Sequence, residues 1–361
     1  MKLFVTNTLL NNGTISANNI GDRASGGSIY VDTSALSGAG VFTANGGNTS
    51  WPYQFSGGGG RIAVYYKNSS FSGNAKADAG VYCFYGCNPA GGDGTIAFFD
   101  TTNNDFYAGS SWRFQKNDGP FNFKHIFVSN GALVTMDEEV SITSDELIVD
   151  KGTSLPLSKG SLFTVNRITI DGGTIISSGE ESIVADILSL SNSAVVTVIP
   201  QQTLTLFVPR IIIDSSSTIS ASEKGNSVGI GFPPTYSGGG SYGGIGGGNT
   251  ATSTYGSATK PVDSGSAGGA PHSIGGGAIR LVVSDSLIND GVISTDGNVS
   301  ASGGSIYVTA KEIKGAGVFR ANGGGLGVGG YFSGPGGGGR IALHYQTYSL
   351  SGKVEALAGC G

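Results

Sequence analysis

The sequence has few cysteines, histidines and charged residues. Its 361 residues include 3 cysteines and 3 histidines, too few for a disulfide-stapled scaffold or a zinc module. Charged residues make up 12% of the chain, about half of the usual share of roughly 25%. With 20 basic residues and a net charge of -5, the chain lacks the basic surface that nucleic acid requires, so we expect no nucleic-acid partner.

Long hydrophobic runs are also missing. No stretch approaches the roughly 20 apolar residues of a membrane-spanning helix, so we expect no membrane span. The apolar run within residues 1–7 is too short for a signal peptide. We find no helical periodicity with capping signals, which favours an all-β chain.

Glycine is abundant, at 64 residues, about two and a half times its usual share of roughly 7%. The glycines have no three-residue period along the whole chain, which excludes collagen, and the aliphatic residues are too regularly placed for a disordered chain. Glycine runs at 57–60 and 336–339 each precede a short aliphatic strand. A phosphate-binding loop instead follows a strand and ends in Gly-Lys-Ser/Thr, so these runs are not nucleotide loops.

An aliphatic-x-aliphatic triplet recurs along the chain, and we expect all of its copies to lie in one register. The twelve triplets, of which the fourth ends in an aromatic residue, begin at Leu3, Ile29, Ile62, Ile96, Ile126, Leu147, Ile168, Leu188, Ile211, Ile279, Ile306 and Ile341. The four central steps are 21, 21, 20 and 23 residues long, and the longer steps elsewhere are filled mainly with Gly, Ser, Asn and Tyr. About 21 residues hold three short strands and three turns, with alternate side chains facing a shared interior.

The repeat predicts a single-stranded parallel β-helix (β-solenoid). We expect about twelve rungs, right-handed winding because parallel crossovers favour that hand, and glycine-rich loops at one corner. The prediction covers residues 1–361 as one continuous solenoid with a long Gly/Ser/Tyr-rich loop insertion at about 224–277. A second column of aliphatic residues accompanies the triplets, at Ile15, Val41, Leu133, Ile175, Val195, Ile219, Val292, Val318 and Val354.

Asparagine or aspartate commonly follows this second column. The residues are Asn18, Asn45, Asp137, Asp296 and Asn322. In three of the five cases glycine comes next, and such dipeptides are typical of turns with positive φ.

Two segments carry a resemblance to a known class of proteins. Gly26-Gly27-Ser28-Ile29-Tyr30-Val31 returns as Gly303-Gly304-Ser305-Ile306-Tyr307-Val308, and Gly40-Val41-Phe42 returns as Gly317-Val318-Phe319. These elements resemble the glycine-rich repeats of very large secreted bacterial β-helix proteins, over residues 1–98 and 279–361. The resemblance implies an extracellular or cell-surface structural module of an adhesin-like protein, and it transfers no catalytic residue.

Both ends of the sequence lie within the repeat. We therefore expect an excised fragment of a longer protein, whose partners are neighbouring solenoid repeats of the same polypeptide or another subunit. Open rung ends also make a self-assembling fibre subunit a possible alternative, because unpaired strand edges invite stacking.

The glycine-rich loops carry aromatic residues that suit stacking on sugar rings. The candidate ligand-binding residues are Trp51, Tyr53, Phe55, Tyr82, Phe84, Tyr85, Tyr331 and Phe332. The alternative is that loop aromatics, including Tyr242 and Tyr255, pack on the solenoid and anchor the loops. Outward positions of the strands also hold apolar residues such as Phe4 and Tyr30, which we expect the loops to cover.

Four aspartates follow the first strand of a rung, at positions 32, 150, 171 and 214. Asp150 and Asp171 fall on successive rungs of the prediction, where a Ca²⁺ ion would relieve their repulsion. The alternative is that the aspartates form Asx turns, and we expect no other cofactor. Cys83 and Cys87 are close enough in sequence to form a local disulfide.

The functional hypothesis is a non-enzymatic extracellular structural or adhesive segment that contacts cell-surface or matrix polysaccharide. A carbohydrate-active enzyme, either a polysaccharide lyase or a hydrolase, is the alternative. It would need about three acidic or basic side chains on one outer face within two or three rungs. The sequence shows no such cluster, so we predict no catalytic residue.

Overall fold

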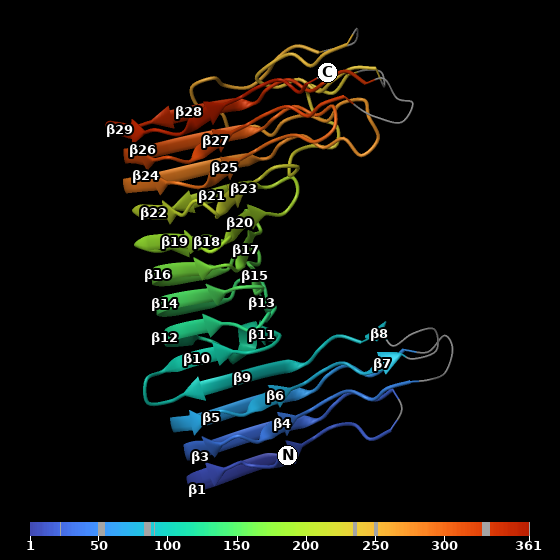
Figure 1. The fold of residues 1–361 in the computed structure, drawn as a ribbon, viewed down its shortest axis with the longest axis vertical. Coiled ribbons are helices and arrows are strands. Elements are labelled where there is room, and N and C mark those ends of the chain that lie inside the picture. The colour runs from blue at the N-terminus through green and yellow to red at the C-terminus, as the bar shows by residue number, and fades with distance from the viewer. Residues whose placement is uncertain are drawn as a thin grey trace. The chain divides into compact units, whose positions relative to one another are not determined.

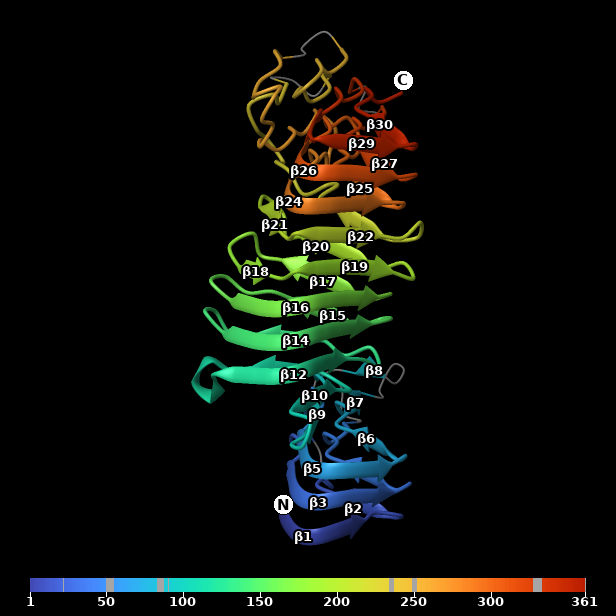
Figure 2. The same ribbon diagram turned by 90° about the vertical axis from the view of Figure 1, so that its left-hand side faces the viewer.

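The computed structural model describes residues 1–21, 23–49, 55–82, 88–89, 91–233, 237–248, 252–326 and 333–360, with only the backbone of residues 82, 88 and 89. It forms two compact units, unit 1 (Met1–Leu155) and unit 2 (Pro156–Gly361). Among the described residues the one helical element is a 3₁₀ turn, η1 (Lys116–Asp118). The predicted all-β class is confirmed, and most strands pair in parallel, as in a β-solenoid (Figures 1 and 2).

Unit 1 is built from long strands that alternate with short ones (Figure 1). The strands are β1 (Lys2–Leu10), β2 (Thr14–Ser16), β3 (Ser28–Gly38), β4 (Val41–Thr43), β5 (Arg61–Phe71), β6 (Asn74–Lys76), β7 (Val81–Tyr82), β8 (Asn88–Pro89), β9 (Thr95–Asp100), β10 (Asp105–Ala108), β11 (Trp112–Phe114), β12 (Phe121–Val128), β13 (Val134–Met136), β14 (Ser141–Asp150) and β15 (Ser154–Pro156), which ends one residue beyond the unit. The long strands pair in the order β1-β3-β5-β9-β10-β12-β14.

Several long strands bend in the middle. The β1–β3 register shifts between Val5 and Thr8. On β3 the buried Thr33 lies at the bend, where the one proton of its hydroxyl is within hydrogen-bond distance of the carbonyls of Asn7 and Ala35, with Oγ1–O distances of 3.1 and 3.0 Å. Ser144 makes equivalent bonds on β14. A buried hydroxyl thus satisfies carbonyls that the bend removes from the ladder.

The chain reverses direction between β9 and β10. These strands form an antiparallel hairpin, whereas β5–β9 and β10–β12 pair in parallel. We call β1, β3, β5 and β9 the first ladder and β10, β12 and β14 the second ladder. The expectation that all rungs run in one direction is therefore wrong for unit 1.

The buried face of the sheet also changes sides at this hairpin. Phe106 lies opposite Phe99 in the antiparallel register, and directly opposite residues share a face. In the first ladder that face is the outer one, since Ile96 packs into the core from the other face. In the second ladder it is the inner one, because Phe106 and its parallel partner Ile126 are buried.

Unit 2 has a similar alternation of strands (Figure 2). Its strands are β16 (Leu162–Asp171), β17 (Thr174–Ser177), β18 (Ser182–Val184), β19 (Ile187–Ser191), β20 (Val195–Val198), β21 (Thr203–Phe207), β22 (Arg210–Ile213), β23 (Thr218–Ser220), β24 (Ala278–Asn289), β25 (Val292–Ser294), β26 (Ser305–Gly315), β27 (Val318–Arg320), β28 (Arg340–His344), β29 (Thr347–Leu350) and β30 (Lys353–Glu355). The short strands pair in parallel in the order β17-β20-β23-β25-β27-β30.

The triplets of unit 2 do not form one column. Ile211 pairs with Leu287 in the second half of β24, whereas Ile279, in the first half, pairs with Leu204. Two aliphatic columns therefore run side by side, one for each half of the bent strands. The single register assigned to the triplets is wrong here, because both halves carry the same alternating pattern.

The predicted second column is displaced by one residue at several rungs. Phe42, Val134, Val196, Ile293 and Phe319 are the buried residues, each one position after the residue that the repeat predicts. A shift of one position moves a side chain to the opposite face of a strand. The sequence has an apolar residue at both positions, so the pattern alone does not choose between them.

The asparagines after the short strands have a different role from the one predicted. Asn45 and Asn322 do not have positive φ. Instead, the side-chain Oδ1 of Asn45 accepts the backbone N–H of Asp78 on the next rung, at 2.9 Å. In unit 2 the Oδ1 of Asp296 accepts the N–H of Asn322 at 2.8 Å. These side chains tie consecutive rungs together.

Glycine-rich segments leave the short strands and return to the next long strand. We call their described parts arms: residues 44–49, 55–60, 77–82, 88–89 and 91–94 in unit 1, and residues 295–304, 321–326 and 333–339 in unit 2. A Cβ on Gly59 would overlap the carbonyl of Ala77, whereas a Cβ on Gly92 would meet nothing. Most arm glycines are therefore required by the close approach of neighbouring backbones rather than by an unusual φ.

In the last arm of unit 2, residues three positions apart face the same neighbouring segment. Gly336 and Gly339 lie against the backbone of Ala301 and Gly304 on the preceding arm. The Gly336 N–H donates to Gly324 at 2.8 Å and the Gly339 N–H to Ala321 at 2.7 Å. Three residues per turn is the period of the polyproline II helix, which has no internal hydrogen bonds and must bond to its neighbours.

The insertion at about 224–277 covers another face of this arm. Gly334 and Gly337 approach Gly247 and Gly244 of the insertion, again three residues apart. The Gly337 N–H donates to the carbonyl of Gly240 at 2.9 Å. The predicted insertion is therefore packed against the arm through its backbone.

Candidate functional site

An aromatic strip crosses the outer face of the first ladder. It comprises Phe4, Tyr30, Tyr65 and Phe99, one ring from each long strand. Successive ring centroids are 5.7, 5.3 and 4.3 Å apart, and the last pair is stacked at an interplanar angle of 5°. Alternation along each strand places these rings opposite the core, so their alignment is a surface feature.

The strip is only partly covered. Phe4 is 70% exposed, which contradicts the expected cover by loops at this position. Tyr65 is half-buried, and burial, followed by the neighbouring Tyr30, Asp118 and Asp32, raises the pKa of its hydroxyl. The phenol therefore stays neutral at physiological pH and can donate a hydrogen bond.

A groove of about 510 Å³ opens where the strip meets the hairpin. We call it the hairpin groove. The groove exists because the core of the second ladder begins at β10, and no other rung of that ladder covers this end of the core. The aromatic residues that line it are Tyr65, Phe99, Trp112, Phe114, Phe121 and Phe123. The indole Nε1 of Trp112 is buried and has no hydrogen-bond acceptor among the described residues.

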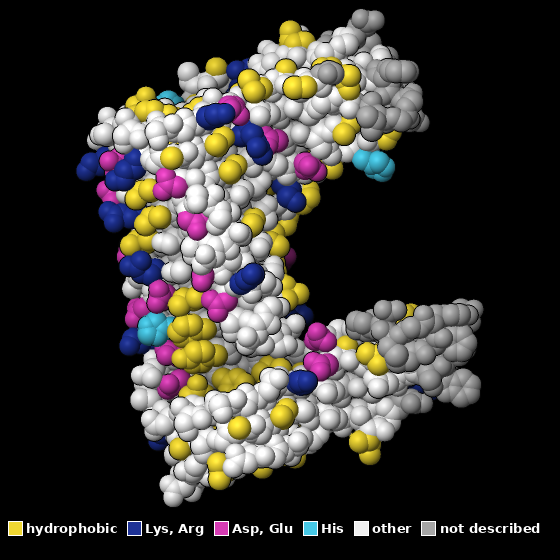
Figure 3. All heavy atoms as spheres, viewed as in Figure 1, with side chains coloured by type: hydrophobic (Ala, Val, Ile, Leu, Met, Phe, Trp, Pro, Cys, Tyr) yellow, Lys and Arg dark blue, Asp and Glu magenta, His cyan; other side chains and the backbone are white. Residues whose placement is uncertain are grey.

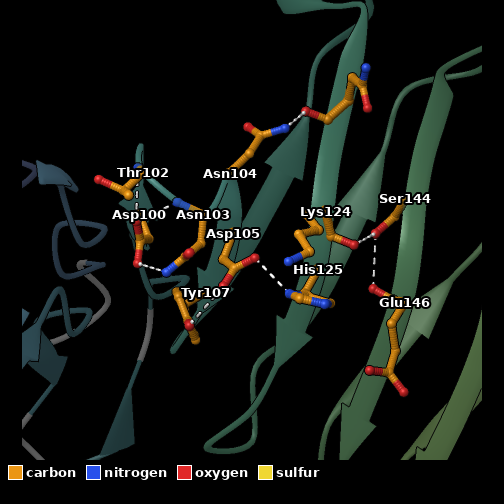
Figure 4. Close-up of polar contacts among 11 residues, drawn as sticks. Asp100, Thr102, Asn103, Asn104, Asp105, Tyr107, Lys124, His125, Ser144 and Glu146 are labelled. Atoms are coloured by element: carbon orange, nitrogen blue, oxygen red, sulfur yellow. Dashed lines mark hydrogen bonds and ion pairs between the residues drawn. The ribbon is translucent and has the colours of Figure 1, made fainter. Parts of the chain in front are cut away.

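Three aspartates and one arginine add polar groups to the hairpin groove. Asp100 accepts the N–H groups of Thr102 and Asn103 at 2.9 Å each and so closes the β9–β10 turn (Figure 4). Arg113 forms an ion pair with Asp137, with Nη2 and Oδ1 2.6 Å apart. Both side chains are therefore held by the fold.

Asp105 belongs to a separate network on β10 and β12 (Figure 4). Its Oδ1 lies 2.7 Å from Nδ1 of His125, and Tyr107 donates its hydroxyl to Oδ2 at 3.4 Å. Burial, followed by the charges of Asp105 and Asp100, raises the pKa of Tyr107. Asp118 is the one aspartate of the hairpin groove whose carboxyl has no hydrogen-bond partner among the described residues.

A second hollow, of about 300 Å³, lies at the end of the first-ladder core. It is lined by Tyr66, Phe71, Ile96 and Phe98 of the first ladder and by Tyr107 of the second. Figure 3 shows hydrophobic side chains gathered around β9, β10 and β12. Both hollows follow from the change of buried face, which leaves the two cores open at the same hairpin.

The hairpin groove places aromatic faces beside carboxylate groups. Aromatic faces pack on the apolar faces of sugar rings, and carboxylate oxygens accept hydrogen bonds from sugar hydroxyls. Glycoside hydrolysis, in contrast, requires two available carboxyl groups on either side of the bond. Asp100 and Asp105 are engaged in structural bonds, which favours binding over cleavage.

Most of the loop aromatics proposed as ligand-binding residues lie outside the described residues. These are Trp51, Tyr53, Phe84, Tyr85, Tyr331 and Phe332, together with the side chain of Tyr82. Phe55 is described and is 77% exposed. In the insertion, Tyr242 is buried and Tyr255 is partly buried, and both are hydrogen-bonded, so there the anchoring alternative is confirmed.

The proposed calcium ligands belong to different units. Asp171 of unit 2 accepts a hydrogen bond from Ser191 Oγ at 2.8 Å. Asp150 of unit 1 lies at a turn, where its carbonyl accepts the Thr153 N–H at 3.1 Å. The described residues contain no group of three or more His, Cys, Asp or Glu side chains arranged to hold a metal ion.

Asp214 shows the Asx turn that was the alternative interpretation. Its Oδ1 accepts the N–H of Ser216 two residues later, at 3.0 Å. Burial of Asp214 opposes its ionisation, yet hydrogen bonds from Ser217 and from the Asn192 N–H hold the pKa of this carboxyl below its usual value. Cys83 and Cys87 lie outside the described residues, and Cys360 is a free, exposed thiol.

No family model matches the sequence, and no curated protein matches it. Among solved structures, the C-terminal domain of a tapirin from Caldicellulosiruptor kristjanssonii aligns with 99% of this chain and 89% of that chain, at 12% identity and a TM-score of 0.22. A likeness at this TM-score carries no argument about fold or function. No helix in the described part of the chain is long and apolar enough to cross a membrane.

Proposed function

We propose that this chain is a non-enzymatic, extracellular structural and adhesive β-solenoid segment of a larger surface protein, and that it contacts polysaccharide through exposed aromatic residues. The observation that carries the proposal is the aromatic strip, which runs across four strands into the hairpin groove. An aligned row of rings on an open sheet face suits an extended polymer better than a compact small molecule.

The proposed scaffold is a solenoid of about twelve rungs. Right-handed winding is the favoured hand for parallel crossovers. Reversal of strand direction together with a change of buried face preserves that hand, so the β9–β10 hairpin is compatible with right-handed winding on both sides. Neighbouring repeats of the same polypeptide or another subunit are the proposed partners along the solenoid.

A polysaccharide lyase or hydrolase is the second candidate. The convergence of Asp100, Asp105, Asp118 and Arg113 on one aromatic groove favours it, since the sequence alone had shown no such cluster. The structural bonds of the first two aspartates and the ion pair of Arg113 count against it.

Binding to a panel of purified polysaccharides, combined with a reducing-end assay on the same samples, tests the proposal. We expect binding without release of reducing ends. Tyr30→Ala should weaken binding about tenfold, because aromatic contacts dominate such interfaces. Tyr348→Ala is the matched control, since Tyr348 also contacts a second surface aromatic ring, that of Tyr345, but lies in unit 2.

Two outcomes would contradict the proposal. Turnover of any polysaccharide that is lost in Asp118→Asn would establish the enzyme alternative. An equal affinity for wild type, Tyr30→Ala and Tyr348→Ala would show that the strip takes no part in binding.

A further inference from the structure

A second groove continues from the hairpin groove along the outer face of the first ladder. Its volume is about 440 Å³, and it shares Trp112, Arg113 and Asp118 with the hairpin groove. Tyr30 of the aromatic strip also lines it. We call it the strand groove. The two grooves therefore form one continuous surface along which an extended chain can lie.

The charges on the two grooves differ. Three aspartates and one arginine line the hairpin groove, whereas Lys2, Arg61, Arg113 and one aspartate line the strand groove. Arg113 is neutralised by its ion pair with Asp137. Lys2 and Arg61 have no carboxylate partner among the described residues. Asp118, which also lines the strand groove, is unpaired as well in the described part of the chain, so Lys2, Arg61 and Asp118 together give the groove a net charge of +1, on a chain whose net charge is -5.

The positions of these two cations follow from the strand register. Lys2 on β1 pairs with Tyr30 on β3, and Arg61 on β5 pairs with Ser28 on β3. The cations thus lie on strands two apart, a separation of about 10 Å. The Tyr30 ring lies on the strand between them, with Lys2 Nζ 5.9 Å from its centroid. Two positive charges therefore flank an aromatic face.

We propose that the strand groove binds a linear anionic polysaccharide. In this arrangement a sugar ring packs on Tyr30, and Lys2 and Arg61 bind carboxylate or sulfate groups on either side. The planar guanidinium of Arg61 suits bidentate bonds to such oxyanions. Neutral hydroxyls of the same polymer face the aspartates of the hairpin groove. The inference rests on the proposed polysaccharide contact and specifies its chemical class.

The test measures the affinity of the full chain for three polymers by affinity electrophoresis and calorimetry. The polymers are a polygalacturonate, a sulfated galactan and a neutral galactan. We expect the affinity for the anionic polymers to be about ten times that for the neutral one. This ratio of affinities should fall as the NaCl concentration increases. The two anionic polymers distinguish carboxylate from sulfate as the preferred group.

Charge-removing variants assign the effect to the groove. Lys2→Gln combined with Arg61→Gln should abolish the anionic preference, so that the anionic polymers bind about as weakly as neutral galactan. Both side chains are exposed, so the variant should fold, as circular dichroism will verify. Lys151→Gln is the control, because Lys151 is an exposed cation of the same unit at the turn after β14.

Different outcomes would contradict the charge inference and the proposed function on which it rests. Equal binding of neutral and anionic polymers that still depends on Tyr30 would overturn the charge inference and leave the proposed function standing. An anionic preference that survives in the double variant would also overturn it. Failure of all three polymers and of the wider panel to bind would overturn the proposed function itself.

Discussion

The arms of unit 1 and unit 2 have similar glycine-rich sequences but are held in different ways. In unit 1 the described parts of the arms contain no buried aromatic side chain, and the exposed Phe55 ring does not anchor them. In unit 2 the insertion supplies Tyr242, which is fully buried and bonds to Ser305 at 2.6 Å. Tyr255 packs 4.8 Å from it and bonds to Ser266 at 2.8 Å.

This difference separates two sources of stability in glycine-rich structure. Backbone hydrogen bonds between arms occur in both units, and each contributes only about 1 kcal/mol net. A buried tyrosine adds hydrophobic area that glycine lacks. We therefore expect the unit 2 arms to be more resistant to opening than the unit 1 arms, and the following variants test that comparison.

The largest effect is expected for Tyr242→Ala. The substitution leaves a cavity at the centre of the unit 2 arms and should destabilise them by about 3–5 kcal/mol. Hydrogen exchange of residues 333–339 should then approach that of the unit 1 arms. Tyr242→Phe, which removes only the bond to Ser305, should cost about 1–3 kcal/mol. Unchanged exchange in Tyr242→Ala would show that the backbone bonds alone hold these arms.

A smaller effect is expected for Gly59→Ala in unit 1. The new Cβ would overlap the carbonyl of Ala77, so the arms must separate, at a cost of about 1–3 kcal/mol. Gly92→Ala in the same arms is the control, since its Cβ would meet no neighbour. The free energy of unfolding from urea titration and exchange of residues 55–60 report the difference. Equal effects of the two substitutions would contradict the close-packing argument.

The smallest effect concerns alkaline pH. Burial, partly offset by the hydrogen bond with Ser266, raises the pKa of Tyr255 to about 12. A raised pKa means that the folded state disfavours the phenolate. The neutral phenol therefore contributes fully to the free energy of unfolding below pH 10, and this contribution is lost as the pH rises towards 12. Exchange at residues 252–266 should accelerate over this range in wild type, and less so in Tyr255→Phe. An identical pH profile for both would refute the assignment.

The sequence predicts the all-β class and the parallel pairing because alternating aliphatic residues leave few other solutions. It does not resolve which half of a bent strand a triplet occupies. The triplets that begin at Ile211 and Ile279 have the same aliphatic pattern in the sequence, yet they lie in different columns of the structure. The bend depends on single hydroxyl residues such as Thr33, which have no distinctive neighbours in sequence.

The candidate site was harder to predict than the fold. The aromatic strip combines Tyr30 from the middle of a triplet with Tyr65 and Phe99 from positions just after one, and only the register aligns them. The hairpin groove depends on a reversal whose sequence signal is the short polar segment between β9 and β10. That segment separates two runs that share an aromatic-rich pattern, which is the one cue for a hairpin.

The packing of the insertion on the last arm has a consequence for biosynthesis. Strands of the ladders pair with neighbours a few tens of residues away, so each rung can form soon after it leaves the ribosome. The carbonyl of Gly240, in contrast, accepts the N–H of Gly337, which lies 97 positions later in the chain and is translated correspondingly later. During that interval the Tyr242 ring has no completed pocket, because the residues that surround it are still being translated. The arms of unit 2 are therefore the last part to mature, and a chaperone acting on this chain would have most time to bind there.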